Sequence, residues 1–502
     1  MSGPDNADLA AGDSDDGHIN EIGRKSRRGM TWSLAGGVIS RLGAFAVTLV
    51  MARLLTPADF GVYAVALAAM GIAMQVNDAG IIPACVQWRG KFEDMAPTAA
   101  TLALLSSIFV YGVLWVSAPA FATLSGTPEA APVVRLVTFF VVVDGVMAIR
   151  GAALRRRFEQ DRLSKANMVG TVVNAAVALP LGFAGAGAYS LAIAYLAGQT
   201  VTSVLVFRMG NLPVKFALDK DIAKKLFAFG LPLAASFGIE SILLNTDFVI
   251  VGNVLGTVWL GFYLVAFNIS NWVPGIVGTA MRYVSVSGFA RLAEQGIESV
   301  VVGVRSTIPT LVSAILPTAV IIATLAPQVI DVLYGNKWAP SAVALPYLMV
   351  LMVVRMLNSL TIDILTSLGS TKVTVWLNAG WAVALIPALW LGTHLDGIRG
   401  TAIAHGVVAV CVALPLGIWA LHLAGIRLGP TLHALIRPAF GAAISAATSM
   451  FVLSLVSGRP LTQLVVAGGA ATVVYILVVV PRDQLRLLKA SVLRASRRPG
   501  AT

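Results

Sequence analysis

Charged side chains within long apolar runs are the residues of this sequence that could do chemistry. Arg41 lies about 16 Å along the helix that the first apolar run would form. Arg355 is central in a later run, with Asn358 and Ser359 one turn on, and Arg282 ends another run. A guanidinium presents a planar fork of donors that suits a diphosphate. We expect Arg41, Arg282, Arg355 and Asn358 to bind such a group in a cavity; the alternative is arginines that snorkel to an interface or pair with carboxylates.

Acidic residues also fall within apolar runs. Glu240 and Asp247 are separated by seven residues, which leaves them about 20° apart around one helix. A carboxylate pair in a low-dielectric cavity suits coupling to H⁺ or Na⁺, whereas charge balance for the arginines is the alternative. Asp78, Asp144 and Asp363 lie nearer the ends of their runs and are expected to be interfacial or paired.

The other reactive residue types predict no catalytic residue, no metal site and no bound cofactor. Cys85 and Cys411 both lie in or beside apolar stretches, so we expect two buried packing residues. His405 fits a packing histidine better than a proton relay. No phosphate-binding loop of ATPases occurs, so the chain is not expected to hydrolyse ATP. Tyr334 and Trp338 flank a loop and are expected to be anchors at a membrane interface.

The composition requires a membrane around most of the chain. Of its 502 residues, 57% are apolar and only 12% are charged, which excludes an ordinary soluble protein and a disordered one. A hydrocarbon core roughly 30 Å thick is crossed by about 20 helical residues. The fold class predicted is an all-α membrane protein of about fourteen transmembrane helices. Their expected ranges are 30–54, 58–82, 96–121, 131–150, 164–184, 187–207, 228–252, 257–283, 306–330, 342–366, 372–393, 398–424, 434–457 and 461–480.

The distribution of positive charge predicts the orientation. Most of the 36 lysine and arginine residues fall in the two tails and in the loops on the same side as the tails. The opposite loops hold only Arg53, Arg135, Lys337, Arg399 and Arg459. Positive loops stay in the cytoplasm, so both termini are expected to be cytoplasmic. Cations spread over many short segments do not form the continuous basic face that nucleic acid needs.

The segments outside the spans have their own patterns. The first 22 residues are acidic and have no apolar period, and a basic run follows at 24–28, so 1–28 are predicted to be a disordered cytoplasmic tail. Residues 482–502 are predicted to be a basic cytoplasmic tail. Within the linker 211–227, Leu218, Ile222 and Leu226 share one helical face while the lysines lie elsewhere. This pattern predicts an amphipathic helix on the cytoplasmic surface.

An internal repeat relates the two halves of the chain. Residues 54–67 (LLTPADFGVYAVAL) align without a gap with 254–267 (VLGTVWLGFYLVAF). The identical pairs are Leu55/Leu255, Gly61/Gly261, Tyr63/Tyr263, Val65/Val265 and Ala66/Ala266. Two six-helix lobes in the same orientation, 29–210 and 228–425, are therefore predicted, with two extra helices in 426–481. Chance similarity between two apolar hairpins is the alternative.

The segments MARLLTPADFGVYAVAL, NTDFVIVGNVLGTVWLGFYLVAFNIS and LYGNKWAPS carry a family resemblance. The chain resembles the polysaccharide transporter (Wzx-type flippase) family of the multidrug/oligosaccharidyl-lipid/polysaccharide exporter superfamily. The resemblance implies two lobes in a V around a central cavity. It also implies that Arg41, in ISRLG, matches a cavity arginine of the related lipid II flippases. One departure is Ser285-Val286-Ser287, where the family usually carries a proline just after helix 8.

The function implied by this resemblance is transport, not catalysis. It is translocation of an undecaprenyl-diphosphate-linked oligosaccharide to the outer leaflet of the bacterial cytoplasmic membrane, by alternating access. The product would serve lipopolysaccharide or exopolysaccharide synthesis, with the polysaccharide polymerase and chain-length machinery as partners. The alternative is a cation-coupled drug or small-molecule antiporter of the same superfamily, in which the acidic pair would be primary. A membrane enzyme acting on the same lipid would need a large outer loop, and the outer loops are short.

Overall fold

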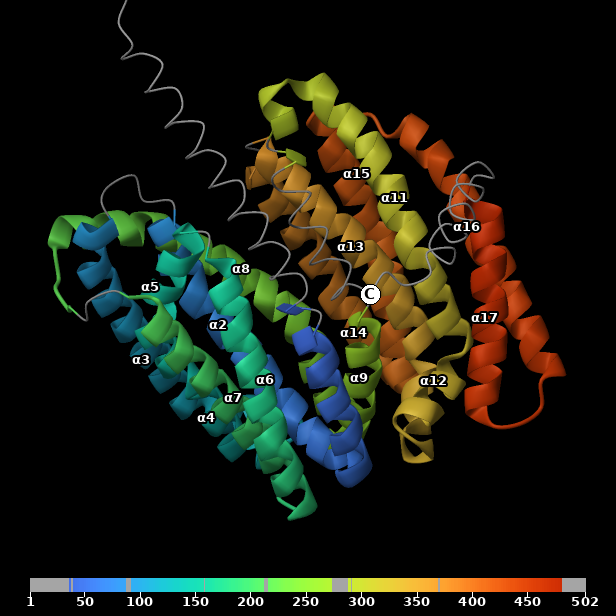
Figure 1. The fold of residues 1–502 in the computed structure, drawn as a ribbon, viewed down its shortest axis with the longest axis horizontal. Coiled ribbons are helices and arrows are strands. Elements are labelled where there is room, and N and C mark those ends of the chain that lie inside the picture. Colours follow the sequence, from blue (N-terminus) through green and yellow to red (C-terminus); the bar gives the residue numbers. More distant parts are fainter. Residues whose placement is uncertain are drawn as a thin grey trace, which may run out of the picture. The chain divides into compact units, whose positions relative to one another are not determined.

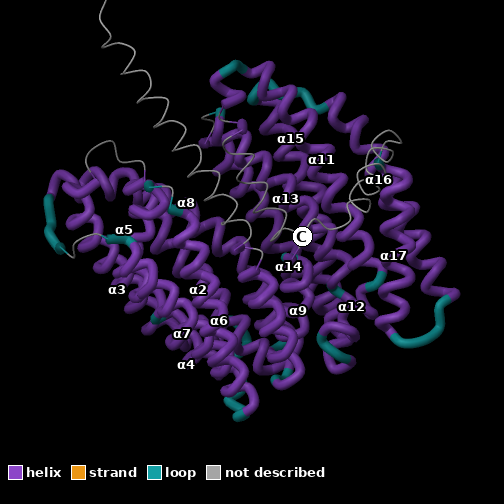
Figure 2. Tube along the Cα trace, in the orientation of Figure 1, coloured by secondary structure: helices purple, strands orange, loops and turns teal. Residues whose placement is uncertain are grey.

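The chain is helical throughout the part described by the computed structural model, which comprises 36–37, 39–86, 92–157, 159–211, 215–272, 288–289, 291–368 and 371–480. Figures 1 and 2 show helices joined by short loops over these residues, without strands. Within this part of the chain, 10 helical stretches are long and apolar enough to cross a membrane. Backbone groups in hydrocarbon must bond within their own segment, which a helix achieves. The predicted all-α membrane fold is confirmed.

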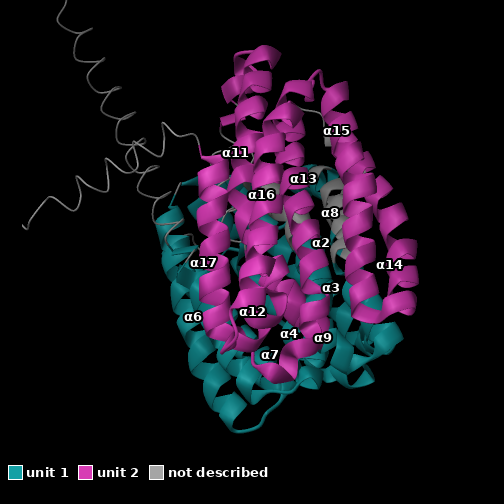
Figure 3. Ribbon diagram, turned by 90° about the vertical axis from the view of Figure 1, so that its right-hand side faces the viewer, with its two compact units in different colours: residues 1–261 teal, residues 262–502 magenta. Residues whose placement is uncertain are grey.

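Two compact units divide the chain, Met1–Gly261 and Phe262–Thr502 (Figure 3). The helices of the first unit are a helix over 39–54, α2 (Pro57–Val86), α3 (Phe92–Leu124), η1 (Pro128–Ala130), α4 (Ala131–Thr138), α5 (Phe140–Arg156), α6 (Gln160–Phe183), α7 (Ala188–Met209), α8 (Lys220–Leu255) and the first turn of α9 (Thr257–Ser270).

The second unit contains the remainder of α9 and the helices that follow it. They are α11 (Ile297–Thr324), α12 (Ala326–Leu333), η2 (Asn336–Val343), α13 (Leu345–Ser367), α14 (Thr371–Val408), η3 (Ala409–Ala413), α15 (Leu414–Leu423), α16 (Gly429–Leu455) and α17 (Pro460–Val479). Within α14 the backbone leaves the helical region at Asp396 and Gly397, so α14 is two helices joined by a tight turn. Each predicted span overlaps one of the helices of the two units; the lobe boundaries at 210 and 228 stay predictions.

A glycine-lined hairpin joins α6 to α7 in unit 1. Gly185 and Gly187 adopt φ values of 76° and 55°, which favour glycine at the turn. A Cβ added at Gly198 of α7 would lie 2.7 Å from the carbonyl oxygen of Gly170 of α6. The two backbones therefore approach closely because neither residue has a side chain there.

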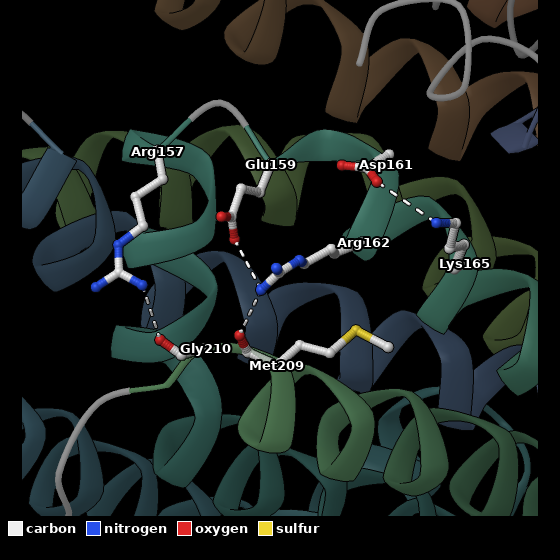
Figure 4. A network of polar contacts seen from close by, with 7 residues as sticks. All are labelled: Arg157, Glu159, Asp161, Arg162, Lys165, Met209 and Gly210. Carbon is white, nitrogen blue, oxygen red and sulfur yellow. Dashed lines mark hydrogen bonds and ion pairs between the residues drawn. The ribbon is translucent and has the colours of Figure 1, made fainter. Parts of the chain in front are cut away.

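Arginines hold the carboxyl end of α7 (Figure 4). Arg157 Nη1 donates to the Gly210 carbonyl oxygen at 3.3 Å, and Arg162 Nη1 donates to that of Met209 at 3.2 Å. Arg162 also forms an ion pair with Glu159 at 3.2 Å. The last carbonyl groups of a helix lack partners within the helix and carry partial negative charge, so guanidinium donors stabilise this end.

The linker before α8 differs from the sequence prediction of a separate surface helix over 214–227. Helix α8 begins at Lys220 and continues without interruption to Leu255, while 215–219 are not helical. The Asp219 side chain caps α8 by accepting from the backbone N–H groups of Asp221 and Ile222 at 2.9 and 3.0 Å. Leu226 is buried in an apolar cluster instead of facing lipid, because this turn of α8 packs within unit 1.

Three further residues are placed differently from the prediction. Tyr334 and Trp338, expected at a membrane interface, are fully buried in unit 2. Their rings meet edge to face at a centroid distance of 6.2 Å, and the Trp338 ring lies 5.9 Å from that of Phe262. The short segments α12 and η2 fold inward here, so the aromatic rings pack on one another. Cys411 is exposed, whereas Cys85 is buried as predicted.

The aligned segments of the repeat cross one another within unit 1. A Cβ at Gly61 of α2 would overlap the carbonyl oxygen of Thr257, and one at Gly261 would overlap that of Pro57. Pro57 and Thr257 are equivalent in the 54–67 and 254–267 alignment, as are the two glycines. The contact is thus reciprocal: the glycine of each segment lies against the backbone carbonyl group of the equivalent residue in the other segment. This reciprocity supports duplication over chance similarity.

We predict that Gly61→Ala and Gly261→Ala destabilise the protein to a similar extent, by about 1 to 3 kcal/mol each, because each added methyl overlaps a backbone oxygen that cannot move aside freely. The measurement is the thermal midpoint of the purified protein in detergent. Gly112→Ala is the control, since a Cβ at this helical position meets nothing within 4 Å. If Gly61→Ala and Gly261→Ala have the same thermal midpoint as Gly112→Ala, the close contact between the two segments is contradicted.

Candidate functional site

Arg355 is held among polarizable groups in unit 2. It lies on α13 and is partly buried. Its guanidinium carbon is 5.9 Å from the centroid of the Phe267 ring, and its Nη1 donates to the Met352 sulfur at 3.8 Å. A cation near an aromatic face is attracted by the quadrupole of the ring. The ring and the sulfur therefore stabilise the positive charge of Arg355 within the protein.

Asn358 lies one turn beyond Arg355 and provides a polar group with unused capacity. Its side chain is 7% exposed, and its Oδ1 accepts no hydrogen bond within the described part of the chain. Across from it, Gly417 of α15 leaves room, because a Cβ there would lie 3.8 Å from both Asn358 Oδ1 and Thr361 Oγ1. A buried oxygen without a donor is costly in a folded protein, which makes Asn358 a candidate ligand-binding residue.

His405 joins this cluster, although the sequence favoured a packing role for it. The side chain is 2% exposed and lies within electrostatic range of Arg355. One turn later the chain forms a π-helical segment, Ala409–Ala413, which ends two residues before Pro415. Such segments often occur at functional sites. Pro415 was the available sequence signal for this irregularity, whereas nothing in the sequence indicated the proximity of His405 to Arg355.

Arg41 belongs to unit 1 and lies on the exposed side of its helix. The helix over 39–54 packs along α6 through small residues: a Cβ at Gly36 would lie 2.9 Å from Ser164, and one at Gly43 would lie 3.1 Å from Thr171. Arg41 is about 160° from Gly43 around the helix, so it is directed away from α6. Its side chain is exposed.

The two acidic residues predicted for ion coupling are both on α8. Asp247 is completely buried within unit 1, where its Oδ1 accepts from the backbone N–H of Phe248 at 3.0 Å. The side chain of Glu240 lies outside the described residues, as does the whole of Arg282. Whether Glu240 and Asp247 act together stays a prediction, as do the assigned roles of Arg41, Arg282, Arg355 and Asn358.

A second polar cluster in unit 1 was missed by sequence reasoning, which assigned Asp144 to the membrane interface or to a pair. Tyr195 of α7 forms a side-chain hydrogen bond with Gln199 and lies within electrostatic range of Asp144 of α5 and of Tyr63 of α2. The four residues come from three helices, so their meeting depends on tertiary packing. No group of three or more histidine, cysteine or acidic side chains that could hold a metal ion occurs among the residues the structure describes.

The long apolar helices define a multi-pass membrane protein, and the comparison with known proteins identifies its class. The family described as "Polysaccharide biosynthesis protein" matches residues 50–343, and the chain belongs to this family. It is 24% identical to the succinoglycan biosynthesis transport protein ExoT of Rhizobium meliloti, over 94% of this chain and 96% of ExoT. It is 21% identical to the lipopolysaccharide biosynthesis protein WzxC of Escherichia coli, over 77% of this chain and 79% of WzxC.

A solved structure shares the fold. The lipid II flippase MurJ, in an inward closed conformation, superposes with a TM-score of 0.75 at 11% identity, over 90% of this chain and 99% of MurJ. The predicted resemblance to the Wzx-type family is thereby confirmed. The predicted class, a multi-pass membrane transporter rather than an enzyme, is confirmed as well.

We predict that Asn358→Leu raises the free energy of unfolding by about 1 kcal/mol, because it removes a buried oxygen that has no donor. The thermal midpoint in detergent measures the change. Asn245→Leu is the matched control: Asn245 Nδ2 donates to the Ser241 carbonyl oxygen at 2.8 Å, so this substitution should lower the midpoint. Equal losses in both variants would show that Asn358 has a structural partner.

Proposed function

We propose that the protein is a flippase that moves an undecaprenyl-diphosphate-linked oligosaccharide from the cytoplasmic to the outer leaflet, for lipopolysaccharide or exopolysaccharide synthesis. The single observation that carries the proposal is the placement of Arg355 and the buried Asn358 one turn apart on α13, with His405 within electrostatic range of Arg355. Unaided passage of a diphosphate and several sugars through hydrocarbon would cost on the order of tens of kcal/mol in lost hydration. A fixed guanidinium and an unbonded amide oxygen replace part of that hydration.

The chemistry of this cluster favours an anionic substrate over a cationic drug. Arg355 supplies a permanent positive charge, and Asn358 can bond to sugar hydroxyl groups. In the proposed mechanism, Arg41 and Arg355 bind the diphosphate in the central cavity that the family resemblance implies. Rocking of the lobes then exposes the cavity to each leaflet in turn.

The remaining parts of the proposal concern orientation, coupling and partners. Both termini lie in the cytoplasm of a bacterium, as the positive loops require, and the protein resides in the cytoplasmic membrane. Glu240 and Asp247 bind the coupling H⁺ or Na⁺. The polysaccharide polymerase and chain-length machinery receive the flipped substrate. The names of the family and of its relatives ExoT and WzxC support a role in polysaccharide export.

We predict that Arg355→Gln slows flipping about tenfold or more, because it removes charge-assisted hydrogen bonds to the diphosphate. Arg355→Lys should retain an intermediate rate, since the charge remains but the planar fork is lost. The assay is movement of a fluorescent polyprenyl-diphosphate oligosaccharide between leaflets of vesicles containing the purified protein.

The control for this assay is Arg399→Gln. Arg399 is an exposed arginine of the same unit, and its Nε lies 3.6 Å from Asp396. This variant should flip at the rate of the unchanged protein, with the amount of inserted protein measured in each preparation. Flipping by Arg355→Gln at the rate of the control would overturn the assigned role of Arg355, and absence of flipping by the unchanged protein would overturn the proposed function.

A further inference from the structure

A pocket of about 160 Å³ in unit 1 shares no lining residue with the proposed transport site. Its walls come from the start of α3, the middle of α5, the end of α7 and the segment before α8. Most of the lining is apolar, and its charged members are Glu93, Arg150 and Lys215. Two aromatic rings, Phe207 and Phe216, complete it. The pocket thus combines a hydrocarbon-like wall with a net positive charge.

The segment 215–219 is fastened to α3, so the pocket has a fixed wall. Thr101 Oγ1 donates to the Ala217 carbonyl oxygen at 2.8 Å, and the Asp219 backbone N–H donates to Thr98 Oγ1 at 3.1 Å. In Figure 1 this segment runs beside the α3 and α5 end of unit 1. These bonds join residues more than a hundred positions apart. They hold the segment that carries Lys215 against α3, which carries Glu93.

Arg150 provides a buried cation in the pocket wall. It is 8% exposed, its guanidinium carbon lies 3.4 Å from the centroid of the Phe207 ring, and its Nη1 donates to the Phe207 carbonyl oxygen at 3.1 Å. Lys215 is exposed at the rim. No ion pair joins Lys215 to Glu93 in the part of the chain that the structure describes. The ammonium group at the rim is therefore available to an incoming anion.

The surroundings place this pocket at a membrane surface. The apolar stretch of α3 begins at Phe92 and that of α7 ends at Met209, beside the pocket residues Glu93 and Phe207. Phe216 and Leu218 on the linker expose 55% and 59% of their surface, although both are large and apolar. Apolar side chains beside lysines and arginines are typical of segments at the boundary between headgroups and acyl chains.

We propose that this pocket binds the headgroup of an anionic phospholipid. The phosphodiester lies between Lys215 and Arg150, and the acyl chains follow the apolar sides of α3 and α5. A soluble phosphate would gain the charge interactions but would leave the apolar wall unused, so the lining favours a lipid. The bound lipid joins the linker to α5 and α7, and it therefore stabilises the segment that leads into α8. The proposed orientation of the protein would place this lipid in the inner leaflet. The binding itself does not depend on the transported substrate.

The test is titration of the purified full-length protein in detergent with phosphatidylglycerol, phosphatidylcholine or glycerol 3-phosphate, followed by the thermal midpoint. Phosphatidylglycerol should raise the midpoint, and the other two should have little effect. Lys215→Gln should weaken the apparent affinity for phosphatidylglycerol about fivefold, the effect of one cation near a membrane surface. Glu93→Gln should increase the affinity for phosphatidylglycerol, because it removes a negative charge that repels the phosphodiester.

Lys224→Gln is the matched control, because Lys224 is an exposed lysine on the first turns of α8 outside the pocket lining. It changes the net charge equally and should leave the affinity unchanged. Equal weakening in Lys215→Gln and Lys224→Gln would overturn the pocket as the site and assign binding to the general basic surface. If phosphatidylcholine stabilises the protein as much as phosphatidylglycerol does, the requirement for an anionic headgroup is overturned. If glycerol 3-phosphate does so, the requirement for acyl chains is overturned.

Discussion

The cost of a charge in hydrocarbon is the constraint on which unit 2 depends. A charged side chain at the centre of a membrane helix costs roughly 2.5 to 3.5 kcal/mol on insertion scales. Arg355 offsets part of this cost with the Phe267 ring and the Met352 sulfur, which attract the cation. Asn358, one turn further along α13, has a buried oxygen that accepts no hydrogen bond within the described residues.

In unit 1 the same constraint places many cations at the ends of helices. Arg150, Arg157 and Arg162 all donate to carbonyl oxygens at the end of α7, where the helix dipole already favours positive charge. Arg41 is different, because it is exposed on the side of its helix opposite the face that packs on α6. The glycines that allow close packing thus also determine the direction in which this arginine points.

Hydropathy and charge placement identified the spans and the isolated arginines, because twenty apolar residues in a row and a charge among them are local features of a sequence. The errors concern properties decided by tertiary contacts. Tyr334 and Trp338 are residue types that often anchor a protein at a membrane interface, but both are buried where α12 and η2 pack in unit 2. The lysines after Asp219 resembled a surface helix, yet an aspartate cap starts a helix that continues into the span. The approach of His405 to Arg355 joins different helices, which no local pattern can indicate.

The reciprocal crossing of Gly61 and Gly261 limits how the two segments can vary. Gly61 meets the backbone of Thr257 and Gly261 meets that of Pro57, so each glycine contacts the counterpart of the residue four positions before itself. A side chain gained at either position would displace the backbone of the other segment, so a change in one segment has a cost for both. The two glycines lie in the stretch over which the segments align without a gap.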